Sequence, residues 1–401
     1  MSRFLILSNG HGEDLSGSLL ARRLMILGNK VDAFPIVGNG NEYKKAKINI
    51  IGNTRNFNTG GLGYNSLKGR FNDLFNGQII YLFKKLFLIF LIRRKYDYFL
   101  VVGDIVPIFF SWISRKKYFT YLVAYSSHYE GKLNLPWPCK HFLTRSHSIR
   151  IYSRDLFTSY DLKNQLNKEV IFLGNPFMDN LSILNKKGNN TFYIALLPGS
   201  RFEELLNNTL MMLELLERLA SYEYFGRIKF NFAMVPDCKI DTIQAILEKR
   251  NWQCVQRLIS ANEIIYCYKF IQVNFSWNAF EEILNKSHLA ISMSGTAAEQ
   301  MVGLGKPVVQ IEGEGPQFTK LFADAQRRLL GEYVFCHTKY LNKDEQIDGT
   351  IDLLLSVMYS IKLDNSFLKN CKQVAKQRIG DRGATIKIAD DIQKHIRSNG
   401  K

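Results

Sequence analysis

Leu196-Leu197-Pro198-Gly199-Ser200-Arg201 follows an apolar run of strand length and opens a helical pattern. Further along the chain, Ser294-Gly295-Thr296-Ala297-Ala298-Glu299-Gln300 does the same, and Gly305-Lys306-Pro307 closes that unit. The carboxyl ends of parallel strands gather at one edge of a sheet, where the N-termini of the following helices attract anions. Two such turns in one half of the chain predict a pocket for a phosphorylated ligand.

The size and charge of the chain leave several partner classes open. Its 401 residues suffice for two domains with large cores, and 46% hydrophobic residues fit a folded protein. An excess of 53 Lys and Arg over 36 Asp and Glu gives a net charge of +17. Such a surface attracts nucleic acid, anionic lipid or nucleotide sugars. The basic residues are spread along the whole chain, so a merely solvated surface is the alternative.

Cysteine usage and the N-terminus favour a cytoplasmic protein. The six cysteines form no C-x-x-C pair, and their spacing fits neither a disulfide framework nor a zinc site; they stand at positions 139, 238, 254, 267, 336 and 371. The apolar run Phe4–Leu7 is too short for the hydrophobic region of a signal peptide. We therefore expect reduced cysteines and no secretion.

Apolar runs of strand length alternate with helical patterns in two series. The first covers residues 4–7, 31–37, 99–102, 119–124, 149–153 and 170–173, and the second covers 192–197, 229–235, 270–275, 288–293 and 308–311. Connections long enough for crossover helices predict parallel α/β sheets. We expect a Rossmann-like domain over residues 1–185, a second over 186–380, a cleft between them, and a helix over 381–401 that packs back on the first domain.

Each of the two opening segments has a simple chemical interpretation. Gly199 allows a tight turn and a close approach by a ligand, Ser200 is expected to cap the next helix with Glu203, and Arg201 can fork onto a diphosphate. A strand-to-helix turn with a surface arginine is the alternative.

The second segment follows the same logic. Gly295 makes the turn, Thr296 is the expected N-cap, and Glu299 falls at the capping-box position, where its role is structural. Gln300 is expected to point toward a ligand sugar.

With these motifs the chain resembles lipid-A-disaccharide synthase, a glycosyltransferase of the two-Rossmann-domain (GT-B) type. The resemblance lies in residues 196–201 and 294–298 and, more loosely, in three further places. Gly174-Asn175-Pro176 is similar to the family's Gly-His-(Pro/Thr) turn, residues 102–107 are similar to Gly-Ile-Asp-Ala-Pro, and the loop before Asp14 is similar to Ala-Gly-Glu-Ala-Ser-Gly-Asp. The landmarks occur in the family's order over residues 1–330.

Departures from the family pattern mark a divergent relative. Gln300 stands where the family has an acid seven residues before the proline, and Glu299 is eight before it. Glu13 neighbours Asp14 instead of preceding it by four. His11 has no counterpart, although other GT-B enzymes have a Gly-Gly-His loop, and residues 121–131 lack the family's Trp-Ala-Trp pattern.

The resemblance implies GT-B architecture, with parallel sheets facing a central cleft, and an inverting, metal-independent transfer of a GlcNAc-type sugar from a UDP-sugar to a lipid or lipid-linked acceptor. No cofactor is implied. The implied base is Asp104, with His11 as its rival; an N-cap role for Asp104 and a loop-packing role for His11 are the alternatives. The remaining candidates fall on the donor side (Gly199, Ser200, Arg201, Ser294, Gly295, Thr296, Ala297, Glu299 and Gln300) and on the acceptor side (Gly10, Gly12, Glu13, Asp14 and Asn175). Acids in a first helical turn, such as Glu13 and Asp14, are also favoured by the helix dipole alone.

Residues 79–95 combine aromatic and aliphatic residues with Lys and Arg. The longest apolar stretch, residues 86–92, is far shorter than the ~20 residues that span a bilayer. The pattern is typical of a helix in a membrane interface. For a cytoplasmic protein, that interface would be the inner face of the cytoplasmic membrane. A core helix with basic ends is the alternative.

Three other functions stay open. A UDP-N-acetylglucosamine 2-epimerase has a similar Ser-Gly turn. A degenerate relative would bind a nucleotide sugar without catalysis, as the loss of an acid at Gln300 suggests. A nucleic-acid-binding protein would explain the charge of +17, but the sequence has no recognisable nucleic-acid module, so that partner is not expected.

Overall fold

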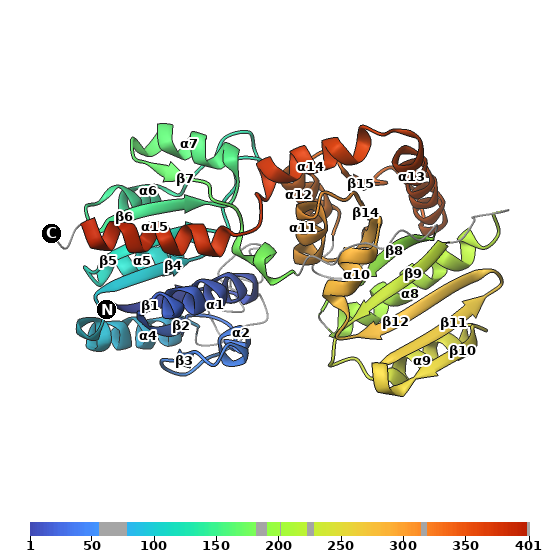
Figure 1. Cartoon of the computed structure of the whole chain (residues 1–401), viewed down its shortest axis with the longest axis horizontal. Coiled ribbons are helices and arrows are strands. Elements are labelled where there is room, and N and C mark those ends of the chain that lie inside the picture. The colour runs from blue at the N-terminus through green and yellow to red at the C-terminus, as the bar shows by residue number, and fades with distance from the viewer. Residues whose placement is uncertain (56–77, 182–190, 201, 223–227, 314–318, 399–401) are drawn as a thin grey trace. The chain divides into compact units, whose positions relative to one another are not determined.

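The chain forms two α/β units (Figure 1). The computed structural model describes residues 1–55, 78–181, 191–200, 202–222, 228–313 and 319–398. Unit 1 comprises Met1–Asn180 and Gln377–Lys401, and unit 2 comprises Leu181–Lys376. The predicted boundaries fell at 185/186 and 380/381.

Unit 1 is built on a parallel sheet with the described strand order β3-β2-β1-β4-β5-β6-β7. The strands are β1 (Arg3–Ser8), β2 (Lys30–Pro35), β3 (Asn49–Ile50), β4 (Tyr98–Val102), β5 (Lys117–Leu122), β6 (Ser148–Ser153) and β7 (Val170–Ile171). The helices are α1 (His11–Ile26), α2 (Asn41–Lys45), α4 (Gln78–Ile92), η1 (Arg93–Lys95), α5 (Ile105–Ile113), α6 (Trp137–Thr144), α7 (Leu156–Leu166), η2 (Pro176–Asn180) and α15 (Ala384–Ser398).

Both faces of the unit 1 sheet are buried, as the continuous apolar runs predict. Leu5 and Leu7 of β1 pack with residues of α4, α5, α6 and α7 on one face, and Phe4 and Ile6 pack with α1, α2 and α15 on the other. The helix expected at residues 79–95 is present as α4 followed by η1.

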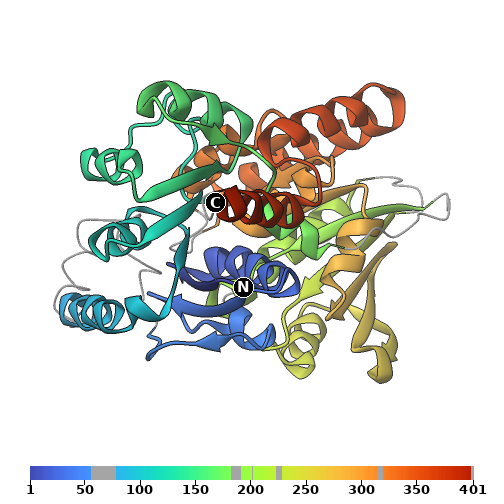
Figure 2. The same cartoon turned by 60° about the vertical axis from the view of Figure 1, so that its left-hand side comes forward.

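Helix α15 returns to unit 1 after the whole of unit 2 and lies along α1 (Figures 1 and 2). Its Ile388, Ala389 and Ile392 are fully buried in the same cluster as Phe4 and Ile6. The Asp391 carboxylate accepts a hydrogen bond of 2.8 Å from the Tyr152 hydroxyl. The last helix therefore completes one of the two layers of unit 1.

Unit 2 has a mixed sheet with the described strand order β10-β11-β12-β9-β8-β13-β14-β15. The strands are β8 (Phe192–Leu197), β9 (Ile228–Met234), β10 (Gln253–Leu258), β11 (Glu263–Tyr268), β12 (Ile271–Trp277), β13 (Leu289–Ser292), β14 (Val308–Gln310) and β15 (Val334–Cys336). The helices are α8 (Phe202–Leu219), α9 (Ile240–Lys249), η3 (Ile259–Ala261), α10 (Phe280–Lys286), α11 (Gly295–Gly303), α12 (Lys320–Leu330), α13 (Lys343–Leu363) and α14 (Phe367–Arg378).

The sequence did not predict β10 and β11, which pair antiparallel with each other, as β11 does with β12. Strand β10 is almost wholly exposed and carries no continuous apolar run. The turns that join these strands contain Asn262 and Lys269, both with positive φ. The expectation of two wholly parallel sheets is therefore wrong for this edge of unit 2 and right for β8, β9 and β12–β15.

Among the described residues, no helix combines the length and the apolar composition that crossing a bilayer requires.

A glycine–glycine crossing joins the returning segment to unit 1. Gly174 and Gly380 both have positive φ, and a Cβ built on Gly380 would lie 2.4 Å from the Cα of Gly174. Between them the fully buried Asn175 amide donates to the carbonyls of Arg154 (2.9 Å) and Ile379 (2.7 Å). Its Oδ1 accepts a hydrogen bond from the Tyr121 hydroxyl. Any side chain at residue 380 would force this crossing apart.

We expect Gly380→Ala to lower the free energy of unfolding by ~1–3 kcal/mol more than Gly383→Ala. Gly383 is the matched control because it also has positive φ, but the nearest atom to a built Cβ is 4.0 Å away. Chemical denaturation of both variants measures the difference. Equal losses would mean that strain at φ, and not the close approach, governs this turn.

Candidate functional site

The two sheets place the predicted motifs where their strand orders reverse. In unit 1 the reversal lies between β1 and β4, and in unit 2 it lies where β8 meets β13. Loops that leave such neighbouring strands in opposite directions open a crevice at the carboxyl edge of a sheet. The predicted donor segments follow β8 and β13, and the predicted acceptor loop and Asp104 follow β1 and β4.

In unit 2 the two segments lie side by side. Gly199 has φ of +108°, and a Cβ built on it would lie 3.8 Å from the carbonyl oxygen of Met293. The Met293 N–H donates to the carbonyl of Leu197 (3.0 Å). The Asn208 amide of α8 donates to the carbonyl of Pro198 (2.7 Å), which fixes the first turn to its helix. Two segments far apart in the sequence thus form one backbone surface.

The start of α11 differs from the predicted cap. The N-cap of α11 is Ser294, whose side chain makes no capping hydrogen bond, and Gly295 is the first helical residue. The prediction of Thr296 as N-cap, with Glu299 in a capping box, is therefore wrong: Thr296 lies inside the helix and is exposed. Helix α8 is described from Phe202 onward, and Arg201 lies outside the described residues, so the cap expected at Ser200 stays a prediction.

The first turn of α11 leaves little room for side chains on one side. A Cβ on Gly295 would lie 3.1 Å from Cζ of Phe322 in α12, so a glycine lets the two helices approach. Ala297 and Gln300 are buried, whereas Glu299 keeps part of its surface exposed. The carboxylate of Glu299 is therefore more accessible than the Gln300 amide that the sequence singled out.

Gln310 is a polar group at this edge that the sequence analysis missed. It ends β14, pairs in register with Ser292 and is fully buried, yet neither atom of its amide has a hydrogen-bond partner in the described part of the chain. Buried amides are normally paired with protein or water. One signal could have revealed it: a single polar residue within the apolar run from Val308 to Ile311.

In unit 1 the Glu13 side chain joins the two loops at the reversal. A Cβ on Gly10 would lie 2.5 Å from its Oε2, and a Cβ on Gly103 would lie 3.5 Å from its Cγ. Asp104 follows directly and accepts from the Asn9 amide (3.2 and 3.1 Å) and the Val106 N–H (2.9 Å). Glycines on both loops thus make space for one carboxyl group beside another.

Asp104 is the N-cap of α5, the structural role that was kept as the alternative. The cap does not use up the carboxylate, because each oxygen can accept two hydrogen bonds. Burial raises the pKa of Asp104, and the hydrogen bonds from Val106 and Asn9 oppose that shift.

Burial also raises the pKa of Glu13 to about 8, and the negative charges of Asp104 and Asp14 add to the effect. The Glu13 residue keeps part of its surface exposed, whereas its carboxyl group is buried between the two loops. The Arg154 charge acts in the opposite direction on the Glu13 pKa. Arg154 follows β6 and is the second residue here that the sequence analysis did not name.

Asp14 belongs to a buried hydrogen-bond chain. The Tyr43 hydroxyl donates to Ser8 Oγ (2.9 Å), and the Ser8 hydroxyl donates to Asp14 Oδ1 (2.6 Å). Burial raises the pKa of Asp14 to about 7, and the Ser8 hydrogen bond opposes this shift. These contacts favour a structural role for Asp14.

The other predicted acceptor residues have different settings. His11 is the first residue of α1, and its side chain lies outside the described part of the chain. A Cβ on Gly12 would meet no atom within 4 Å, so packing does not require a glycine there. Asn175 is fully buried at the crossing described above, away from solvent.

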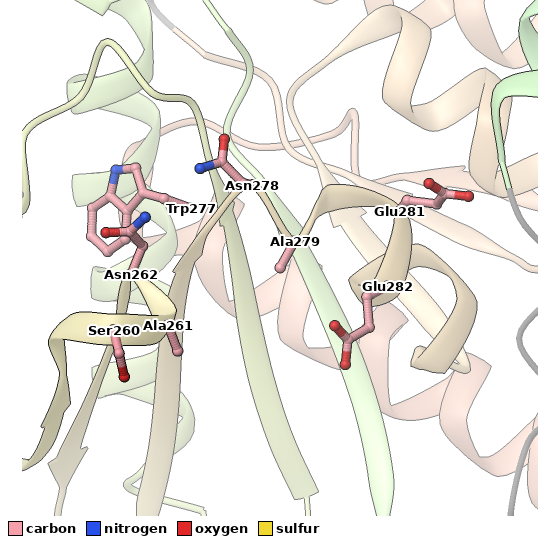
Figure 3. Close-up of a pocket in the computed structure, with 8 residues that line it drawn as sticks. All are labelled: Ser260, Ala261, Asn262, Trp277, Asn278, Ala279, Glu281 and Glu282. Carbon is pink, nitrogen blue, oxygen red and sulfur yellow. The ribbon is translucent and has the colours of Figure 1, made fainter.

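A pocket of about 390 Å³ lies elsewhere in unit 2, where β12 ends (Figure 3). It is lined by Ser260, Ala261, Asn262, Trp277, Asn278, Ala279, Glu281 and Glu282. Figure 3 shows the carboxylates of Glu281 and Glu282 pointing in different directions, so they do not converge on one point in the pocket. Among the described residues, no group of His, Cys, Asp and Glu side chains is arranged to hold a metal ion.

No protein-family model matches the chain, and no curated protein matches it by sequence. Solved structures do match over nearly the whole length. The Acinetobacter baumannii MurG structure is 13% identical, with a TM-score of 0.59, and 98% of this chain and 100% of that chain are covered.

Two further structures match in the same way. Staphylococcus aureus MnaA, solved with UDP, is 14% identical, with a TM-score of 0.56 and coverage of 99% and 97%. The Neisseria meningitidis UDP-GlcNAc 2-epimerase, solved with UDP-GlcNAc, is 12% identical, with a TM-score of 0.55 and coverage of 99% and 100%. The predicted fold class is confirmed: the chain has the GT-B fold.

The raised pKa of Glu13 makes stability depend on pH. The folded protein keeps a proton that the unfolded chain releases above pH ~4.5, so stability falls as the pH rises toward about 8. We expect the wild type to lose ~1 kcal/mol or more relative to Glu13→Gln between pH 5 and pH 8.5, measured as urea unfolding. Glu130→Gln, at an exposed glutamate, is the control. Parallel pH profiles for wild type and Glu13→Gln would contradict the assignment.

Proposed function

We propose that this chain is a metal-independent, inverting hexosyltransferase that moves a GlcNAc-type sugar from a UDP-sugar to a lipid or lipid-linked acceptor, in the manner of lipid-A-disaccharide synthase. One observation carries the donor half of this proposal. The turn at Gly199 lies against the carbonyl of Met293, which brings the two segments that resemble that family together at a strand-order reversal. In this role the protein would serve glycolipid biosynthesis and lipid metabolism.

The donor diphosphate needs positive charge and unpaired N–H groups. The first N–H groups of α11, from Gly295 onward, have no partner within the helix, and the helix dipole favours an anion there. The Gly199 turn lies against the carbonyl of Met293, just before this helix, and in the proposal Ser200 and Arg201 add a hydroxyl and a guanidinium. We assign the ribose hydroxyl to the carboxylate of the partly exposed Glu299, in place of the acid that Gln300 replaces.

The acceptor hydroxyl needs a base. In the transfer, the acceptor oxygen attacks the anomeric carbon, its proton passes to a carboxylate, and the bond from the anomeric carbon to the UDP oxygen breaks. Asp104 suits the role of base, because its burial raises the pKa and so makes the carboxylate a stronger proton acceptor. Glu13 holds a proton below about pH 8, so it would place no second negative charge beside the carboxylate of Asp104.

A UDP-sugar 2-epimerase is the second candidate. The favouring observation is the pair Glu13 and Asp104, since two carboxyl groups in different environments can serve as acid and base. The Staphylococcus aureus MnaA and Neisseria meningitidis UDP-GlcNAc 2-epimerase structures share this fold over nearly the whole chain.

A thermal-shift screen tests the donor site. We expect UDP and UDP-GlcNAc, but not GDP-sugars, to raise the melting temperature, because a ligand that binds only the folded state stabilises it. Arg201→Ala is expected to abolish the shift, and Arg218→Ala, at the far end of α8 and paired with Asp348, to preserve it. The absence of any nucleotide response in the wild type would remove the basis of both enzyme candidates.

Product analysis distinguishes the two reactions. With UDP-GlcNAc and a mixture of glycolipid acceptors, we expect UDP release that requires acceptor and falls ~10²-fold or more in Asp104→Asn. Asparagine is the informative replacement, because it keeps the N-cap of α5 while removing the charge. Conversion of UDP-GlcNAc to its 2-epimer without acceptor, followed by NMR, would instead establish the epimerase.

A further inference from the structure

Helix α4 leaves a stripe of large apolar side chains exposed. Ile80, Phe83, Phe87 and Leu91 are 63%, 67%, 66% and 61% exposed. They recur at intervals of three and four residues, so they form one face of the helix. An exposed face of this size marks a binding surface more often than chance.

The opposite face of α4 anchors the helix to unit 1. Ile89 is fully buried and Ile92 nearly so, both in the core beneath the sheet. The buried Lys85 amine donates to the carbonyl of Pro35 (3.0 Å) and lies 4.4 Å from the centre of the Phe34 ring. The stripe is therefore held rigidly outward.

Cations surround the stripe. Lys84, Arg94 and Lys95 are exposed on α4 and η1. Between residues 78 and 103 the sequence contains one acid, Asp97, and its carboxylate accepts from the Arg3 N–H (2.8 Å). No carboxylate stands on α4 or η1 to repel an anionic surface.

The cationic border continues onto the neighbouring loops. Arg93 donates to the carbonyl of Ser114 (2.8 Å), which fixes the next loop, with exposed Arg115 and Lys117, beside η1. Lys117 pairs with Tyr98 in the sheet and lines a hollow of about 480 Å³ together with Arg145 and Lys168. These groups share the amino edge of the unit 1 sheet with the end of α4.

We propose that unit 1 docks on an anionic phospholipid bilayer, with Ile80, Phe83, Phe87 and Leu91 inserted among the lipids and the surrounding Lys and Arg side chains on the phosphates. The helix has 15 residues, fewer than the ~20 needed to cross the bilayer, so it lies in the interface. An anionic membrane is the proposed occupant, because the exposed apolar side chains and the Lys and Arg side chains beside them complement its lipid tails and its phosphates.

Vesicle co-sedimentation of the full chain tests the proposal. We expect binding to vesicles of phosphatidylcholine with phosphatidylglycerol, weak binding to phosphatidylcholine alone, and loss of binding at high salt. Phe83→Glu with Phe87→Glu is expected to lower the partition coefficient at least ~10-fold, because it removes apolar insertion and adds negative charge. Arg94→Glu with Lys95→Glu should reduce only the part of vesicle binding that depends on anionic lipid.

Phe270→Glu is the matched control, since Phe270 is also an exposed phenylalanine (55%) but lies in unit 2. Each variant is first shown to melt as the wild type does and to keep its response to UDP, which separates failure of docking from failure of the donor site. Wild-type protein that ignores anionic vesicles at low salt, or a Phe83/Phe87 variant that binds like the wild type, would overturn the proposal. So would a change from dimer to monomer in that variant on sedimentation, which would assign the stripe to a second copy of the chain.

Discussion

Close approach of backbone turns at the two strand-order reversals governs both candidate sites. A β-strand of a parallel sheet can deliver its following loop only to one edge, so the chemistry of each unit collects there. A Cβ at residue 10 would lie 2.5 Å from Oε2 of Glu13, so a glycine there lets the first loop touch the Glu13 carboxyl group. At residues 103 and 199 a Cβ would lie at ordinary contact distances from Glu13 (3.5 Å) and Met293 (3.8 Å), and the positive φ is what favours glycine at both positions.

The charge of the protein is divided between two physical roles. The excess of basic residues is largely at the surface, where it acts over distances of a Debye length and depends on salt. Glu13 and Asp14 of unit 1 sit in poorly solvated places, and the charges of Asp104 and Asp14 further disfavour ionisation of Glu13.

Much of this organisation could be predicted from the sequence, because buried parallel strands produce continuous apolar runs followed by glycine turns. The strands around Leu197 and Val102 were found in this way. Strand β10 was not, because an exposed edge strand carries no apolar run. The start of α11 was displaced by two residues, since the choice between Ser294 and Thr296 as N-cap depends on backbone angles that composition does not fix. The proton held by Glu13 could not be predicted, because it results from burial by residues distant in the chain.

The position of α15 has a consequence for synthesis on the ribosome. Unit 2 is an insertion within unit 1, so residues 181–376 can complete their own core while the cluster around Phe4 and Ile6 still lacks Ile388, Ala389 and Ile392. During translation, therefore, the unit made first is the one finished last. Its open apolar face has to be kept from other chains for as long as the second unit takes to emerge, which makes it the expected place for a chaperone to bind.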